Sequence, residues 1–177
     1  MKLIEPTPEY ADQIAAYRRA FLEYGGSMDG CGPLRRYEDP MEWLAFVEAM
    51  KKPETTPEGL VSATQLIYVH EEDGKIAGMI QIRHYFNEYL EKYAGHIGYS
   101  VAPDERRRGH ATAMLHLALP ICRELGIEKA LVCCLVENEA SRRTILNNGG
   151  VYESTVYEPE RDMRLERYWI DTRSAER

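Results

Sequence analysis

The chain has 177 residues, 44% of them hydrophobic and 29% charged, and its formal net charge is −7. These are globular values, and the length suits one core, so we expect a single domain over residues 1–177. No apolar run approaches the roughly 20 residues of a membrane span, the N-terminus lacks a secretory pattern, and the acidic balance disfavours nucleic acid, so we expect a cytoplasmic protein without membrane or nucleic-acid partners.

The first quarter of the chain predicts two helices. A short strand at 2–5 precedes a helix that begins at 7–9 and ends near Tyr24, and a second helix runs from 39 or 40 to about 50. The glycine-rich segment 25–33 separates them. A mobile substrate loop and a plain flexible connection remain equally open interpretations of this segment.

The rest of the chain alternates strands with helices. Strands at 64–71 and 75–83 flank the turn Glu72-Asp73-Gly74-Lys75, which is typical of a hairpin, and residues 84–92 form an ambiguous link. The elements that follow are strand 95–101, helix 109–125, strand 128–136, helix 139–148, and strands 151–158 and 164–171.

Residues 97–112 are the most informative segment, because they combine a strand, a basic turn with a glycine, and a helix. The first amides of a helix lack intrahelical partners and lie at the positive end of its dipole, so this order builds an anion site. Arg106, Arg107 and Arg108 add positive charge there. The spacing of a Walker loop and that of a dinucleotide fingerprint are both absent.

Two motifs resemble one known family. The spacing Arg-x-x-Gly-x-Ala, from Arg106 to Ala111, is similar to the pyrophosphate loop of the GNAT family, the Gcn5-related N-acetyltransferases that use acetyl-coenzyme A. The strand at 128–136 followed by Asn138-x-x-Ser141 resembles the family's fifth strand and the helix after it. The resemblance implies an α/β (α+β) fold, a mixed twisted sheet of about seven strands flanked by about four helices. Its fourth and fifth strands would be parallel and splayed, with pantetheine between them.

The resemblance also implies where acetyl-coenzyme A binds as acyl donor. It places the backbone of Tyr99 and Val101 on one wall of the slot, and Asn138 and Ser141 near the thioester. Capping of the helix at 139–148 would by itself account for Asn138. The implied cofactor-binding residues are Tyr99, Val101, Arg106, Arg107, Arg108, Gly109, His110, Ala111, Thr112, Asn138 and Ser141.

The chain departs from the family pattern at both usual acid–base positions. Many relatives have a tyrosine where this chain has Ile145, and some have a glutamate where it has Gly95. Catalytic candidates therefore come from local reasoning: His96, Tyr99 and Ser141. A histidine titrates near neutrality, but alternation places His96 on the face opposite Gly95 unless a bulge intervenes, and a structural role stays open.

No metal site is expected, because the four cysteines form no Cys-x-x-Cys pair. The favoured function is transfer of an acetyl group from acetyl-CoA to a primary amine of an unidentified small molecule by direct attack. A noncatalytic acyl-CoA-binding regulatory module is the alternative, since the usual acid and base are missing. Transfer to an aminoacyl-tRNA or protein amine is disfavoured by the acidic balance, which instead favours a cationic acceptor. The oligomeric state stays open, a homodimer included.

Overall fold

The computed structural model describes residues 1–173, which contain a seven-stranded mixed sheet in the order β1-β2-β3-β4-β5-β7-β6. All neighbouring strands are antiparallel except β4 and β5, which are parallel. The strands are β1 Lys2–Ile4, β2 Ala63–Val69, β3 Ile76–Arg83, β4 Ile97–Val101, β5 Lys129–Leu135, β6 Val151–Glu158 and β7 Met163–Asp171. The predicted strands are all present, with ends that shift by at most two residues.

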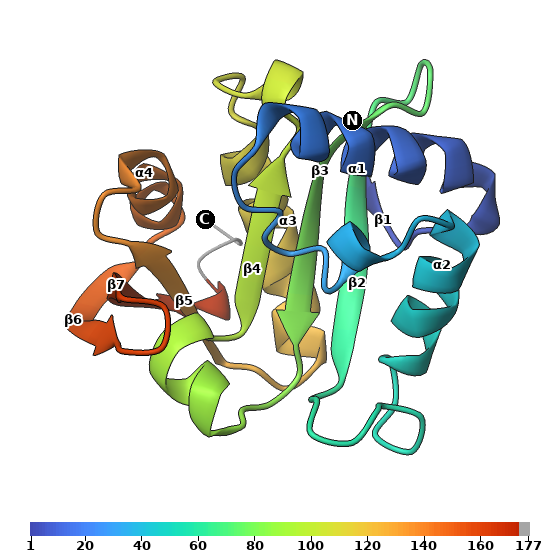
Figure 1. Cartoon of the computed structure of the whole chain (residues 1–177). Coiled ribbons are helices and arrows are strands. Elements are labelled where there is room, and N and C mark those ends of the chain that lie inside the picture. The colour runs from blue at the N-terminus through green and yellow to red at the C-terminus, as the bar shows by residue number, and fades with distance from the viewer. Residues whose placement is uncertain (174–177) are drawn as a thin grey trace.

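Four α-helices flank the sheet, with α1 and α2 on one face and α3 on the other, while α4 lies beyond β5 (Figure 1). They are α1 Ala11–Tyr24, α2 Pro40–Ala49, α3 His110–Glu124 and α4 Glu139–Asn147. The link that the sequence left ambiguous contains a π-helical turn, Leu90–Ala94. No helix in the described part of the chain is both long enough and apolar enough to span a bilayer.

Each face of the sheet carries its own core, because successive side chains of a strand point to opposite faces. Leu66 and Tyr68 of β2 pack with the buried face of α3, whereas Ile67 and Val69 pack with α1 and α2. Trp43 of α2 is fully buried in the second core. The fixed sheet between the two cores carries the candidate site.

The two parallel strands separate soon after they meet, as the family resemblance implied. β4 and β5 pair at Ile97 and Val132, and the remainder of β4 pairs only with β3 among the described residues. Figure 1 shows the two strands diverging, with α4 and the β6–β7 hairpin on the far side of the gap. Just before β4, Gly95 has a φ of 69° and packs closely on β5, since a Cβ there would lie 2.3 Å from Leu131 O.

The middle of the glycine-rich segment is held firmly against the sheet. Ser100 Oγ donates to Asp29 O at 2.6 Å, and the buried Gln65 Nε2 donates to Gly30 O at 2.7 Å. Trp43 Nε1 donates to Cys31 O at 2.9 Å. Residues 29–31 are therefore hydrogen-bonded to α2 and to strands of the sheet, and they form a wall beside β4. The four cysteines are all free.

Candidate functional site

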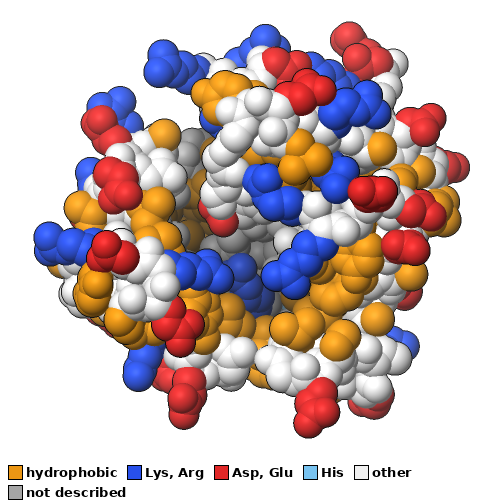
Figure 2. All heavy atoms as spheres, in the orientation of Figure 1, with side chains coloured by type: hydrophobic (Ala, Val, Ile, Leu, Met, Phe, Trp, Pro, Cys, Tyr) orange, Lys and Arg blue, Asp and Glu red, His pale blue; other side chains and the backbone are white. Residues whose placement is uncertain are grey.

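A cavity of about 1300 Å³ opens where β4 and β5 part. Figure 2 shows it as a hollow in the face that carries α1, with basic side chains around it. One end is lined by the first turn of α3 and the loop before it, and the N-terminus of α4 forms a side wall. The rest of the lining comes from segment 26–32 and the turn Leu90–Ala94, so residues far apart in sequence meet here.

The backbone of β4 faces the gap at two residues. Ile97 pairs with β5, whereas Ala102 N–H donates to β3 at 2.9 Å. Because the backbone groups of a strand alternate in direction, those of Tyr99 and Val101 share the side of Ile97 and point where β5 no longer follows. An extended ligand can therefore pair with β4 as an additional strand does.

The N-terminus of α3 forms an open cradle of amides. Gly109 caps the helix with φ 82°, and the first intrahelical bond runs from Ala113 N–H to Gly109 O at 3.0 Å. The amides of His110, Ala111 and Thr112 precede that bond and have no helical acceptor. A Cβ at Gly109 would meet nothing within 4 Å, so the cradle is accessible to an anion.

The three arginines before the cradle have different surroundings. The Arg106 guanidinium stacks over Tyr24, 4.8 Å from the ring centroid, and its Nε donates to Val101 O at 3.2 Å. Arg107 is exposed, with a left-handed φ of 63°. Both line the cavity, whereas Arg108 lies outside its lining and donates to Glu105 Oε2 at 3.0 Å.

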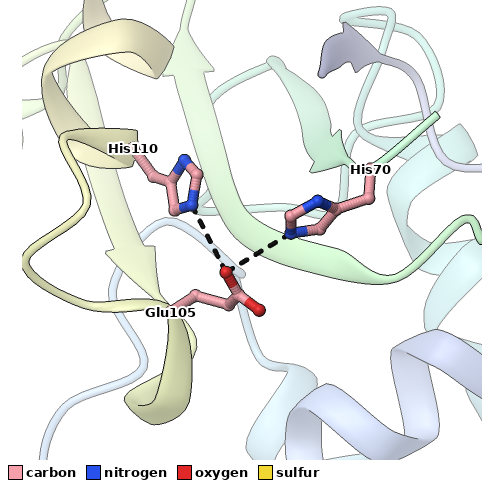
Figure 3. Close-up of side chains that lie close together, drawn as sticks. All are labelled: His70, Glu105 and His110. Atoms are coloured by element: carbon pink, nitrogen blue, oxygen red, sulfur yellow. Dashed lines mark hydrogen bonds and ion pairs between the residues drawn. The ribbon is translucent and has the colours of Figure 1, made fainter. Parts of the chain in front are cut away.

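Glu105 holds the loop before α3 in place through ion pairs and hydrogen bonds, a role that the sequence did not reveal. Its Oε2 lies 3.3 Å from Nε2 of both His70 and His110 (Figure 3), and Lys75 Nζ donates to its Oε1 at 2.7 Å. The hydrogen bond from Lys75, with help from His70, lowers the pKa of Glu105 to about 2. The two histidines and Glu105 offer ligand atoms within 4.8 Å of one another, but a divalent cation there would face the charges of Lys75 and Arg108.

Tyr99 and Ser141 meet across the gap. The Tyr99 hydroxyl lies 2.7 Å from Ser141 Oγ, and burial raises the pKa of Tyr99 well above its usual range. Asn138 Oδ1 accepts Ser141 N–H at 3.1 Å and so caps α4, while also lining the cavity with Tyr99 and Ser141. Ile145 is fully buried in the core. Of the tyrosines that line the cavity among the described residues, Tyr99 is the one hydrogen-bonded to the N-terminal turn of α4.

His96 lies away from these groups. Its Nδ1 accepts Leu131 N–H at 3.0 Å, and its ring centroid lies 4.0 Å from that of Phe86. Burial, together with the charge of Arg83, lowers the pKa of His96 to about 4. His96 is not among the residues that line the cavity, so its contacts give it a packing role away from the proposed reacting groups.

The charge of the cavity is opposite to that of the whole chain. At the inner end of the cavity, which no sequence motif indicated, Arg83 of β3 reaches over Gly98 of β4. A Cβ at Gly98 would lie 3.2 Å from Arg83 Nη2, so the absent side chain gives the guanidinium room. The lining carries the arginines Arg83, Arg106, Arg107, Arg143 and Arg161 but only the carboxylates Asp29, Glu105 and Glu139.

Solved structures with the same fold include a ribosomal-protein-S5-alanine acetyltransferase from Vibrio fischeri, with a TM-score of 0.70, 16% identity, and coverage of 96% of this chain and 92% of that one. A variant of the spermidine N-acetyltransferase of Vibrio cholerae has a TM-score of 0.66 and 13% identity, with coverage of 99% and 97%.

A Salmonella typhimurium protein solved with its cofactor acetyl-CoA has a TM-score of 0.65 and 16% identity, with coverage of 97% and 93%. At such identities the similarity shows the fold. Among curated proteins, none has a sequence that matches this chain. The model of the family described as the acetyltransferase (GNAT) family matches residues 31–149, well over half of the chain. The chain therefore belongs to the GNAT family of acetyl-CoA-dependent N-acetyltransferases.

Proposed function

We propose that this chain, with residues 1–177 as one domain, transfers the acetyl group of acetyl-CoA to a primary amine of a small molecule by direct attack. The parting of β4 and β5 after Ile97 carries this proposal, because it joins an open amide cradle to a cavity of about 1300 Å³. One opening thus has room for a phosphorylated carrier at one end and an acceptor at the other.

The residues around the gap fit acetyl-CoA, which supplies the acetyl group as a thioester. The amides at Gly109, His110, Ala111 and Thr112 would hold the pyrophosphate, with Arg106 and Arg107 contributing charge and Arg108 fixing the loop through Glu105. The backbone of Tyr99 and Val101 would pair with the pantetheine amides, while Asn138 and Ser141 would lie beside the thioester.

The acceptor must lose one proton to water before it can attack as a neutral amine. A nitrogen–carbon bond then forms, the nitrogen gives its second proton to water, the carbon–sulfur bond breaks, and the leaving thiolate takes up a proton. Tyr99 is the proposed donor, because its hydroxyl lies at the gap, where Ser141 orients it, and a phenol is protonated at neutral pH. The phenolate then regains a proton from water. The Val101 amide is the proposed donor to the oxyanion. Positioning alone is worth up to about 7–11 kcal/mol, which makes a dedicated base dispensable.

A titration with acetyl-CoA tests the site. Gly109→Asp and Gly109→Asn add side chains of nearly equal size at the same left-handed φ, but only Asp adds a negative charge to the cradle. We expect Asp to weaken acetyl-CoA binding at least about tenfold more than Asn, a difference of about 1.4 kcal/mol. Equal affinities for the two variants would show that no phosphate lies at this helix.

Turnover separates the two functions that remain. Release of free thiol with any member of a panel of primary amines supports the transferase. The missing tyrosine at Ile145 and glutamate at Gly95 favour the second candidate, a noncatalytic acyl-CoA-binding module. Saturable binding of acetyl-CoA without turnover of any amine would favour that module, and an absence of binding would overturn both.

A further inference from the structure

Arg83 holds an uncompensated charge at the inner end of the cavity. It is partly buried, and its Nη1 donates to Gly95 O at 3.1 Å and to Ala94 O at 3.4 Å. No carboxylate of the described residues lies within ion-pair distance of it. Burial lowers the pKa of Arg83, while the nearby charge of Asp29 raises it. A guanidinium has five N–H donors, so Nε and Nη2 are left to bind something else.

The opposing groups nearby do not neutralise Arg83. Burial raises the pKa of the Cys133 thiol to about 12, so it carries no charge at neutral pH. Arg161 adds a second cation at this end, 5.6 Å from the ring centroid of Tyr89. The backbone amides of residues 160 and 161 bind Glu158, which is buried, so its carboxylate is held within its own turn.

We infer that the acceptor carries a carboxylate close to its amine, and that Arg83 binds it. This inference rests on the proposed transferase and names its substrate class, an amino acid or a related amino carboxylate. A carboxylate presents two oxygens that match two guanidinium donors, which is why arginine recognises this group so often.

The register of the sheet places Arg83 beside the part of β4 that faces the gap. Arg83 Nη2 lies over Gly98, and the next residue, Tyr99, carries both the gap-facing backbone and the proposed proton donor. An anion bound by Arg83 would therefore lie on the face of the sheet that carries Gly30, beside the part of β4 whose backbone faces the gap. Asp29 lines the same region and offers a carboxylate to the protonated amine before it reacts.

Matched acceptors test this inference on the unaltered protein. The standard amino acids, their carboxamides and the corresponding decarboxylated amines differ at the carboxylate, and free-thiol release, corrected for the fraction of neutral amine, gives kcat/KM for each. We expect the best amino acid to exceed its carboxamide about 10- to 100-fold, as for a hydrogen-bonded charge. Equal or better use of the carboxamides or decarboxylated amines would overturn the inference and leave the transferase intact.

Substitutions assign the preference to one side chain. Arg83→Gln should lower kcat/KM for the amino acid about 10- to 100-fold and leave that for the carboxamide nearly unchanged, with Arg83→Lys in between. Arg164→Gln removes an exposed arginine that lies outside the cavity lining, and it should preserve the preference. An equal loss for both acceptors in Arg83→Gln would contradict the assignment, and unchanged acetyl-CoA affinity would show that the variant is folded.

Binding keeps the inference testable without turnover. The protein saturated with coenzyme A is titrated with each amino acid and its carboxamide. Binding of the amino acid but not of its carboxamide, lost in Arg83→Gln, would support the carboxylate site even if every amine fails to react. Failure of every amine to react would then overturn only the proposed transferase. Absence of amino-acid binding together with absence of turnover would overturn the inference.

Discussion

The two halves of the cavity are built from different parts of the chain. The half proposed for the cofactor presents backbone amides at the start of α3 and along β4, and these come from one stretch of sequence, 97–112. The half proposed for the acceptor is lined by side chains that only the fold brings together, such as Arg83 from β3 and Asp29 from the segment after α1. A backbone site leaves a spacing pattern in the sequence, whereas a side-chain site leaves none.

Gly30 packs directly on β4, and its substitution should have the largest effect on stability of the proposed changes. A Cβ there would lie 2.2 Å from Gly98 O, at a φ of 72°. We expect Gly30→Ala to lower the free energy of unfolding by about 3 kcal/mol or more, because strain and overpacking add. Gly26→Ala is the control, since its φ is 89° but a Cβ would meet nothing within 4 Å, and it should cost about 1 kcal/mol. Similar urea midpoints for both variants would show that the segment does not pack on β4 this closely.

Tyr99 stands at the boundary between the halves. We expect Tyr99→Phe to lower kcat about 100-fold, because the leaving thiolate loses its proton donor, with acetyl-CoA affinity unchanged within about twofold. Tyr157→Phe removes another hydroxyl, one that is exposed and bonded to Asp162, and should leave kcat unchanged. A kcat for Tyr99→Phe near that of the unaltered protein would show that water protonates the thiolate.

The stabilisation that Glu105 provides to the loop before α3 should depend on pH. Ion pairing holds the pKa of Glu105 at about 2, below the 4.5 of a free glutamate, so its stabilisation is complete above pH 4.5 and disappears towards pH 2. Glu105→Gln should cost roughly 1–2 kcal/mol at pH 7, and the difference from the unaltered protein should narrow between pH 4.5 and 2.

Asp104→Asn is the matched control for Glu105→Gln. Asp104 bonds the same Lys75 at 2.6 Å but is exposed, so its loss should cost under about 1 kcal/mol. Urea unfolding at a series of pH values gives both comparisons. If the difference in free energy of unfolding between Glu105→Gln and the unaltered protein stays constant down to pH 2, Glu105 is not paired as described.

The same contrast explains which features the sequence could predict. Hydrophobic period and turn residues located the strands and helices, and the Asn138 cap and the Gly109 turn followed from local rules. The position of Arg83 over Gly98 could not be predicted, because it depends on the pairing of Gln81 with Gly98 in the β3–β4 register. The contacts of Glu105 likewise need groups from the β2–β3 hairpin, which no local pattern connects to the loop.

His96 belongs to neither half, and this sharpens the boundary between them. Its pKa of about 4 leaves it neutral from pH 5 to 8, so it cannot produce a rate inflection near neutrality. We expect His96→Gln to keep kcat/KM within about threefold and to preserve the pH–rate profile.

The effect of His96→Gln should appear in the free energy of unfolding instead. As the pH falls below 6.5, the unfolded chain protonates this histidine, whereas folded His96 binds a proton only near pH 4. The free energy of unfolding of the unaltered protein therefore decreases between pH 6.5 and pH 4, and that of His96→Gln decreases less. A rate inflection that vanishes in His96→Gln would return this histidine to the chemistry and break the division between a backbone-built and a side-chain-built half.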